Sequence, residues 1–246
     1  MLRRASSIPQ LEESAVLHLG SLARLDDSDL RRIAKAAADA RYYPARTELV
    51  HEGAEPARPS LLLHGWISHQ RILPDGRRQI VGFTLAGELF GRNWGWQSCA
   101  LTSHVALDDV VVCSAPQANE GSALWEAYDR ERLAQRLQLI DNITRLGRMD
   151  ARERVCDLLL ELLERLERSG QTDGNTFAMP LTQECFSDAV GLTPVHLNRT
   201  LQACRKSGDL SWRGGLVTLH NPARLDRSLG RRRRKPDIRQ ADAVFA

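Results

Sequence analysis

The spacing of apolar and polar residues divides the chain into helical and strand-like stretches. Residues 11–40 hold a short helical run, with aspartate and serine at the expected helix start. Over residues 42–113, short β-prone pieces alternate with Gly, Pro and Asp, and Leu-Pro-Asp-Gly at 73–76 predicts a hairpin turn. Short strands separated by frequent turns are typical of a sandwich or a roll.

A second helical pattern occupies residues 119–148. Its 4-3-4 spacing predicts a coiled-coil seam formed by Leu133, Leu137, Ile140 and Thr144. A second apolar stripe contains Leu139, Ile143 and Leu146. We therefore expect one side of this helix to pack on the roll and the other on a second copy of the chain. The alternative is a single helix buried within one subunit.

The next helix is expected after a break at Gly147, because Asp150 and Glu153 have the spacing of a capping box. One face of this helix carries Val155, Leu158, Leu159, Leu162 and Leu166. Such a stripe predicts a helix that packs on a core with one side.

Three segments follow a different pattern. Residues 169–176 are polar and are expected to form a connector, whereas residues 177–181 are expected to form a strand. Residues 212–218 contain a Gly-Gly turn between apolar residues, which predicts a two-stranded β-wing.

Between these segments, residues 181–206 predict a helix-turn-helix. Thr182 can cap the first helix with its hydroxyl, and Gly191 suits the left-handed conformation that ends a helix. Thr193 can cap the second helix, where Pro194 fits the first position because its missing N–H costs no hydrogen bond.

The second helix of this motif has two faces of opposite character. Its apolar face carries Leu197, Leu201 and Cys204. Its other face carries Val195, Asn198, Arg199 and Gln202. An amide and a guanidinium on one face can make bidentate contacts to base edges in a major groove. The alternative is an ordinary solvated helix, but the caps, the short turn and the downstream hairpin together favour DNA binding.

The motif resembles the DNA-binding domain of Crp/Fnr-type bacterial transcription regulators. The resemblance rests on Leu-Thr at 181–182, Gly-Leu-Thr at 191–193 and Asn-Arg-x-Leu at 198–201. It extends back through residues 61–91 and 145–166, and covers about residues 15–228.

The resemblance implies an α+β fold and a homodimer. A cyclic-nucleotide-binding-like β-roll would occupy residues 11–118, and a long dimerisation helix residues 119–148. A winged helix-turn-helix would occupy residues 149–228, and the basic tail 229–246 is expected to be disordered.

The charge distribution agrees with a DNA-binding C-terminal part. Residues 181–246 carry 12 Lys or Arg against 6 Asp or Glu, whereas residues 1–180 carry 22 against 25. A basic third on a mildly acidic body is expected where one domain meets phosphate. The candidate DNA-binding residues are Thr182, Thr193, Val195, His196, Asn198, Arg199, Gln202, Arg205 and Arg213.

Within this set, the resemblance implies distinct roles. Arg199 would read a guanine, and Val195, where relatives often carry glutamate, would face a thymine methyl group. Arg213 in the wing would contact phosphate. Because a two-fold dimer presents two such helices, the operator should be an inverted repeat of double-stranded DNA.

The sensor part matches the cyclic-nucleotide-binding branch of the family only in part. Gly87 and Glu88 match its Gly-Glu pair, but residues 99–108 lack the Arg and hydroxyl residue that grip the cyclic phosphate, and Arg92 has the wrong offset. We therefore expect an unknown small-molecule effector other than cyclic AMP, with Glu88 as a weak candidate contact.

The other sensor chemistries of this family use an iron–sulfur cluster or haem. The first 98 residues contain no cysteine, which excludes the iron–sulfur cluster of the oxygen-sensing branch. Haem would need axial ligands, for which the candidates are His51, His64 and His69, although residues of this kind are more often surface positions of strands. An apolar pocket could be lined by Trp66, Trp94 and Trp96, although core packing explains them equally well.

The remaining features point away from catalysis and membranes. Five scattered cysteines have no zinc-site spacing, and Cys185 and Cys204 fall on apolar helix faces as buried residues. No Walker, G-x-S-x-G or H-E-x-x-H motif is present, so neither enzyme activity, metal nor cofactor is expected.

No apolar run reaches the length of a membrane span, and the N-terminus has no secretory h-region, so we expect a cytoplasmic regulator. RNA polymerase is a further candidate partner. The alternative function is a ligand-binding module, for a cyclic nucleotide or haem, whose helix-turn-helix serves in protein interaction.

Overall fold

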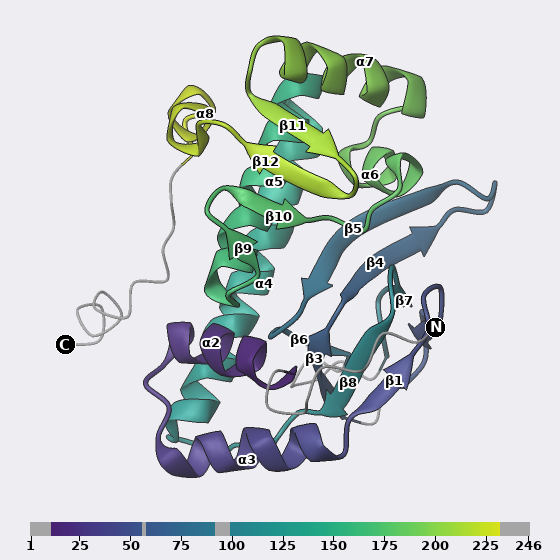
Figure 1. Ribbon diagram of the computed structural model, residues 1–246. Coiled ribbons are helices and arrows are strands. Elements are labelled where there is room, and N and C mark those ends of the chain that lie inside the picture. The colour runs from purple at the N-terminus through teal and green to yellow at the C-terminus, as the bar shows by residue number, and fades with distance from the viewer. Residues whose placement is uncertain (1–10, 56–57, 92–98, 232–246) are drawn as a thin grey trace, which may run out of the picture.

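The computed structural model describes residues 11–55, 58–91 and 99–231 and has an α+β architecture (Figure 1). Two N-terminal helices lie at one end, strands of a β-roll lie in the middle, and the C-terminal helices and strands lie at the other end. Two long helices run along the molecule and connect these parts. The α+β fold class inferred from the sequence is thus confirmed.

The N-terminal helical run forms two helices, α2 (Glu13–Leu22) and α3 (Asp27–Ala38). Asp26 caps α3 by accepting hydrogen bonds from the backbone N–H groups of Ser28 and Asp29, and the Asp29 side chain accepts the Asp26 N–H in return. This capping box explains why the helix begins where the aspartate cluster begins.

The roll consists of two four-stranded antiparallel sheets. The first has the order β1 (Arg41–Tyr43), β8 (Val110–Ser114), β3 (Pro59–His64) and β6 (Leu89–Gly91). The second has the order β2 (Glu48–Val50), β7 (Ser103–Ala106), β4 (Trp66–Ile72) and β5 (Arg78–Leu85). The predicted hairpin turn is confirmed between β4 and β5, where Gly76 has φ +84°.

The long helix α4 (Ala123–Arg148) has 26 residues and begins at a Ser122 cap. It continues through Gly147, so the break expected there falls at Met149 instead, because Met149 is extended (ψ 145°). Helix α5 (Ala151–Arg168) starts directly afterwards at the predicted Asp150–Glu153 capping box.

The packing of α4 differs from the prediction. Leu139 and Ile143 of the second stripe are 50% and 72% exposed, so this stripe does not pack on the roll. The first turns of α4 pack on the roll through Leu124, Ala127 and Tyr128. Farther along, the side that faces the roll is polar: the Gln135 amide donates to the Leu89 carbonyl (2.8 Å), and the Asn142 amide donates to the Val81 carbonyl (3.3 Å). Backbone carbonyls of the roll need donors, which apolar side chains cannot supply.

The C-terminal part combines α5 with two hairpins and three short helices. The hairpins belong to one sheet with the order β11 (Leu210–Arg213), β12 (Leu216–Leu219), β10 (Thr176–Ala178) and β9 (Thr172–Asp173). The helices are α6 (Gln183–Val190), α7 (Pro194–Lys206) and α8 (Pro222–Ser228). The segment 169–176 is therefore not a plain connector, because it supplies β9 and the turn to β10.

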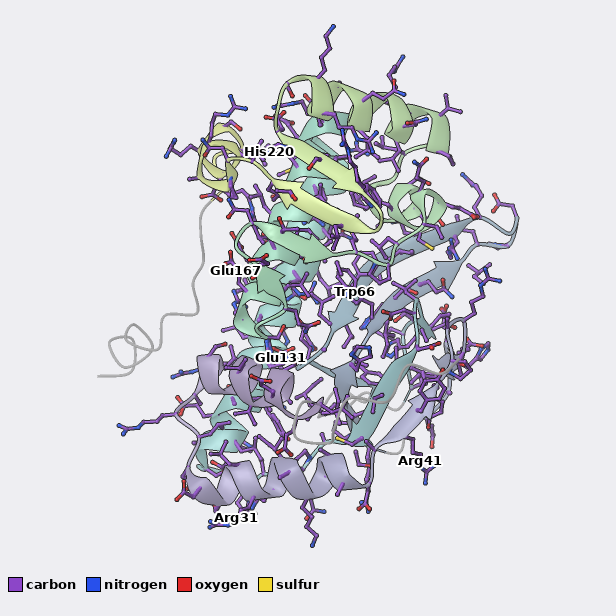
Figure 2. The ribbon with its side chains drawn as sticks, in the orientation of Figure 1. Arg31, Arg41, Trp66, Glu131, Glu167 and His220 are labelled. Carbon is purple, nitrogen blue, oxygen red and sulfur yellow. The ribbon has the colours of Figure 1, made fainter. Side chains whose placement is uncertain are left out.

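The C-terminal part and the roll share one hydrophobic core. Trp66, Phe83 and Leu85 of the roll belong to the same buried cluster as apolar residues of α5, α6 and α7. Trp66 lies at this junction, with its ring edge to face against Phe83 at a centroid distance of 6.1 Å (Figure 2). Its role is thus core packing.

Two further observations complete the fold. Arg231, at the start of the basic tail, pairs with Asp157 (2.9 Å) and Glu164 (3.2 Å) of α5, so the tail is fixed at its first residues; residues 232–246 lie outside the described part. Cys204 is buried as expected, whereas Cys185 is only half-buried. None of the described helices combines the length and the hydropathy needed to cross a membrane.

Candidate DNA-binding face and ligand cavity

The helix-turn-helix is formed by α6 and α7, and its local geometry follows the predicted signals. The Thr182 hydroxyl accepts the Cys185 N–H (3.1 Å), and the Thr193 hydroxyl accepts the His196 N–H (3.3 Å). Gly191 ends α6 with φ +63° and ψ 42°, the left-handed conformation that only glycine adopts at low cost. Both threonines therefore orient their helices while remaining exposed at the surface.

The two faces of α7 separate as predicted. Leu197, Leu201 and Cys204 are fully buried, and Thr200 lies between them with its hydroxyl donating to the His196 carbonyl (2.9 Å). The opposite face is exposed and carries Val195, Asn198, Arg199, Gln202 and Arg205. Val195 is 82% exposed, which leaves its methyl groups available for contact. Arg199 forms no ion pair with any residue that the structure describes.

The wing is the β11–β12 hairpin beside α7. Gly214 (φ +58°) and Gly215 (φ +79°) form its turn, with positive φ at both positions. Trp212 packs edge to face on Phe186 of α6 at 5.6 Å, which fixes the wing against the helix-turn-helix. The Arg213 side chain stands exposed next to the turn. The exposed face of α7 and the wing lie at the end of the molecule that is far from α2 and α3 (Figure 1).

A cavity of about 530 Å³ lies between the roll and the two long helices. The roll contributes His69, His104 and Phe90, α4 contributes Arg132 and Arg136, and α5 contributes Arg165. This volume is in the range of small-molecule sites. The arginines that line the cavity come from the helices, whereas residues 99–108 contribute none.

Two stacked imidazole rings form one wall of the cavity. His69 and His104 lie 4.2 Å apart between ring centroids, at an interplanar angle of 22°. Burial, the neighbouring His104 and Arg165 hold the pKa of His69 well below its usual value, and burial lowers the pKa of His104 to about 4. Both rings are therefore neutral near pH 7. Stacked rings do not direct nitrogens at a common point, which does not suit two axial haem ligands.

Glu88 is engaged by a residue of the C-terminal part. Arg165 of α5 donates from Nε to Glu88 Oε1 (2.8 Å) and from Nη2 to Glu88 Oε2 (2.6 Å), and Oε2 also accepts the Leu85 N–H (2.9 Å). Glu88 is only 3% exposed and is not part of the cavity lining. Its candidate role as a ligand contact therefore does not fit the structure, because its acceptor sites are already used.

Further buried charges continue from Arg165. Its Nη1 donates to Glu161 (2.9 Å), and Arg145 of α4 donates to Glu161 (2.5 Å) and Asp157 (2.8 Å). Burial alone would raise the pKa of Glu161, but the two guanidinium groups hold it below its usual value. Opposite charges thus alternate across the junction of the roll, α4 and α5, which is the arrangement that buried charges need.

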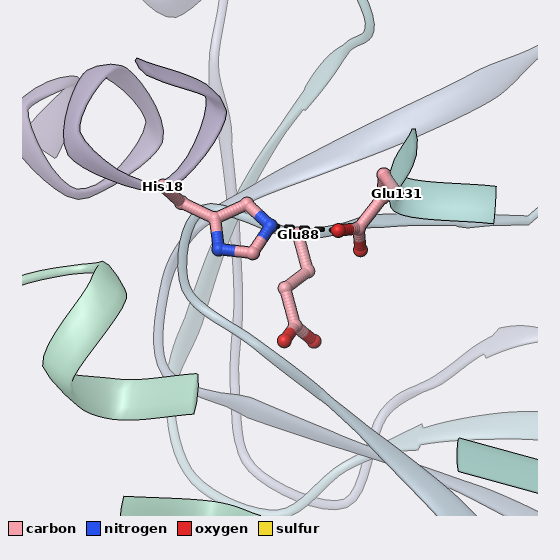
Figure 3. A group of neighbouring side chains, drawn as sticks. All are labelled: His18, Glu88 and Glu131. Atoms are coloured by element: carbon pink, nitrogen blue, oxygen red, sulfur yellow. Dashed lines mark hydrogen bonds and ion pairs between the residues drawn. The ribbon is translucent and has the colours of Figure 1, made fainter. Parts of the chain in front are cut away.

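A third buried pair joins α2 to α4 (Figure 3). His18 Nε2 lies 2.7 Å from Glu131 Oε2, and Gln135 donates to the other oxygen of Glu131 (3.0 Å). Ligand atoms of His18, Glu88 and Glu131 lie within 4.8 Å of one another. A metal ion would have to displace the Arg165 guanidinium from Glu88 and the proton between His18 and Glu131, so this donor set favours ion pairs over metal binding.

The comparisons with known proteins agree with this geometry. A model of the Crp-like helix-turn-helix domain matches residues 153–228, and a model of the cyclic nucleotide-binding domain matches residues 40–120. The nitrogen fixation regulation protein FixK of Bradyrhizobium diazoefficiens is 33% identical over 175 residues, which cover 67% of this chain and 71% of FixK. The chain belongs to the Crp/Fnr family.

Other relatives support the assignment. The fumarate and nitrate reduction regulatory protein of Escherichia coli K12 is 26% identical over 175 residues, covering 69% of this chain and 70% of the relative. The structure of FixK2 from Bradyrhizobium japonicum superposes with a TM-score of 0.66 at 26% identity, covering 76% of this chain and 95% of FixK2. The relatives are transcription regulators, and this Crp/Fnr member is a DNA-binding transcription regulator of the same kind.

In this Crp/Fnr protein, the candidate residues fall into two groups. Most of the DNA-binding candidates gather on the exposed side of α7 and on the wing, with His196 half-buried. Of the haem candidates, His51 and His64 are exposed on or beside strands, and only His69 lines the cavity. Arg92, Trp94 and Trp96 lie outside the described residues.

The residues that sequence reasoning missed are those of the junction. Arg165, Arg145, His18 and Glu131 were not among the predicted site residues, yet all are buried. Arg165 stands in a helix whose leucine stripe attracts attention first, and its partner is 77 positions away. The only signal in the sequence is that Arg165 precedes Leu166, at the edge of the leucine stripe, where a charged side chain can be partly buried.

Proposed function

We propose that the protein regulates transcription as a homodimer that binds an inverted-repeat operator and responds to a small molecule in the cavity. The exposed face of α7 carries the proposal, because it presents a methyl-bearing side chain, an amide and a guanidinium from successive turns of one helix. Its buried face is apolar, so the helix has a defined outward side. We expect this face to bind DNA in the cytoplasm. RNA polymerase would be a further partner there.

The roles of individual residues follow from their positions. Asn198 and Arg199 would meet base edges, with Arg199 bidentate to a guanine, and Val195 would contact a thymine methyl group. Thr182, Thr193 and Arg213 would contact phosphates, which position the protein without reading sequence. His196, Gln202 and Arg205 would lie at the edges of this surface.

The dimer is supported by the outward side of α4. Leu133 and Ile140 are 54% and 51% exposed, and the Thr144 hydroxyl is turned back to the Ile140 carbonyl (3.0 Å). With half-buried Leu137, they form an apolar stripe that no described part of the chain covers. A second copy of α4 would bury it as a coiled coil.

Three observations bear on the effector. The cavity volume suits a small molecule, and the Arg132 and Arg136 side chains on its α4 wall favour an anionic one. Glu88 is held by Arg165, so a cyclic nucleotide would find a key position of its binding pattern already used. We therefore expect an effector other than cyclic AMP.

Binding-site selection from random double-stranded DNA tests the proposed function. The expected result is an inverted repeat whose half-site centres lie about 34 Å apart, one helical turn. Recovery of no sequence, together with a stable protein complex that is insensitive to salt, would instead support a protein-interaction role for the helix-turn-helix.

Dimerisation has its own test. Leu137→Asp should shift the protein toward the monomer in light scattering, because the dimer would bury an unpaired charge. Ile143→Asp, on the neighbouring exposed stripe, is the matched variant and should weaken the dimer less. A wild-type protein that is monomeric at micromolar concentration would contradict the dimer.

A further inference from the structure

One guanidinium at the junction between the roll and the C-terminal part makes most of its hydrogen bonds across that junction. Of the three nitrogens of Arg165, two donate only to the roll: Nε to Glu88, and Nη2 to Glu88 and to the Phe83 carbonyl (2.6 Å). Only Nη1 bonds within α5, to Glu161. Arg165 is 3% exposed, and its partners Glu88 and Phe83 are buried as well.

Little else in the backbone fixes the direction of α5. Two residues, Met149 and Asp150, separate the end of α4 from the start of α5, and Met149 is extended. The orientation of α5 relative to α4 therefore depends on side-chain contacts. The core in which α6 and α7 pack on α5 also includes Trp66, Phe83 and Leu85 of the roll. The recognition face therefore follows the position that α5 takes against the roll.

A second contact lies at the far end of the junction. Arg78 of β5 donates to Asp188 of α6 (2.8 Å), and the Gln79 amide donates to the Asp188 carbonyl (2.7 Å). The Arg78 side chain is 29% exposed, so water competes for this pair more than for Arg165 and Glu88. The apolar core shared with the roll and the bonds of Arg145 to α5 add to both contacts. Of the two ion pairs with the roll, the buried one is expected to constrain the orientation more.

We propose that Arg165, through its bidentate hold on Glu88, is a positioning residue that fixes the spacing of the two recognition helices in the dimer. The proposal rests on the proposed function, since spacing matters only to a dimer on a two-part operator. In this arrangement the α7 face is exposed, so the contact holds a geometry that DNA can reach. Arg165 also lines the cavity, so any occupant of the cavity lies against the same side chain.

The decisive variant removes both charges together, Arg165→Met with Glu88→Gln. Replacing a buried pair by neutral groups of similar volume leaves no unpaired charge, and the amide oxygen of the new glutamine can still accept the Leu85 N–H. The matched control is Arg231→Gln, which removes a guanidinium that pairs with Asp157 and Glu164 of the same helix and does not reach the roll.

The assay compares four DNA duplexes: the selected operator, the operator with one base pair added or removed between half-sites, and a single half-site. One base pair shifts a half-site by about 3.4 Å along the axis and rotates it by roughly 35°. The wild type and Arg231→Gln should bind the altered spacings at least about tenfold more weakly than the operator, because both half-sites cannot be engaged at once.

The double variant should lose this preference. We expect it to bind the operator about tenfold more weakly than the wild type, to bind all three spacings alike, and to keep the wild-type affinity for the single half-site. A folded, dimeric double variant that keeps the wild-type spacing preference would overturn the proposal. So would a loss of half-site affinity at unchanged melting temperature, since Arg165 would then act inside the DNA-binding unit.

If the double variant does not fold, Glu88→Gln alone decides. It keeps the volume and one of the two bonds to Arg165, so a smaller loosening of the spacing preference is expected, and an unchanged preference overturns the proposal. Failure of the proposed function is recognised separately, because no operator would then be selected at all.

Discussion

Arginine stands in two opposite settings in this protein. Arg199 on α7 is exposed and unpaired with any described residue, whereas Arg165 on α5 is buried and bonded to Glu88, Glu161 and the Phe83 carbonyl. The exposed guanidinium has donors available for the DNA contact that we propose. The buried one has used its donors to join two parts of the chain. The proposed DNA contact thus depends on donors that have no partner among the described residues. The geometry of the junction depends on donor nitrogens that are all bonded.

The largest effect is expected on stability, when the buried Arg165 is replaced. Arg165→Met leaves the Glu88 carboxylate buried without its partner, so the free energy of unfolding should fall by about 3–5 kcal/mol. Urea unfolding measures this change, and the added Glu88→Gln substitution should recover much of it. A loss below about 1 kcal/mol would mean that water reaches Glu88 and that the two settings differ less than the structure indicates.

For the exposed Arg199, we expect an effect on DNA binding and not on stability. Arg199→Ala should weaken operator binding by about 1–3 kcal/mol and relax the preference at one base pair, because a bidentate contact to guanine is lost. Its unfolding curve should stay close to that of the wild type. Gel-shift titrations and a repeated binding-site selection provide the measurement, and an unchanged consensus would reject α7 as the recognition helix.

The same contrast explains which parts the sequence could predict. The caps at Thr182 and Thr193, the Gly191 turn and the two faces of α7 depend on residues a few positions apart, and the structure confirms each of them. Local patterns suffice to predict these features, because they depend on neighbouring residues and not on a partner far away in the sequence.

The junction could not be predicted in this way. Arg165 meets Glu88 across 77 positions and His18 meets Glu131 across 113, and in the sequence these residues look like members of solvated helix faces. The second stripe of α4 failed for a related reason. An apolar spacing shows that a helix could be covered on that side, but not that the roll presents carbonyl groups, which require Gln135 and Asn142 instead.

A change of pH should test a second buried ion pair, the one between His18 and Glu131. Burial by itself lowers the pKa of His18, but attraction and a hydrogen bond from Glu131, with a contribution from Glu88, raise it overall; the pKa of Glu131 is lowered by the same pair. Because the pKa of His18 is higher in the folded than in the unfolded state, its protonation stabilises the fold. This contribution is complete below about pH 6.5, the unfolded-state value, and is lost as the pH rises through the folded-state pKa. A lowered glutamate pKa stabilises it above about pH 4.5 and less as pH falls.

The pair should therefore stabilise the protein most between these limits. His18→Gln with Glu131→Gln removes both charges, so the difference in unfolding free energy between wild type and double variant should be larger near about pH 6 than near about pH 9. Urea unfolding at the two pH values gives the result. A difference that does not change with pH would show that His18 is neutral throughout and only packs against Glu131.

The smallest effect is expected from Arg213, an exposed arginine for which we propose a phosphate contact. Arg213 stands beside the Gly214–Gly215 turn of the wing, where a guanidinium can reach the DNA backbone. Arg213→Ala should weaken binding to all sequences alike and reduce the slope of log affinity against log salt by about one unit, since one phosphate contact is lost. Binding titrations over a series of salt concentrations measure the slope. If Arg213→Ala instead changes the preferred sequence and leaves the slope unchanged, the wing reads bases, and base recognition then involves the wing as well as α7.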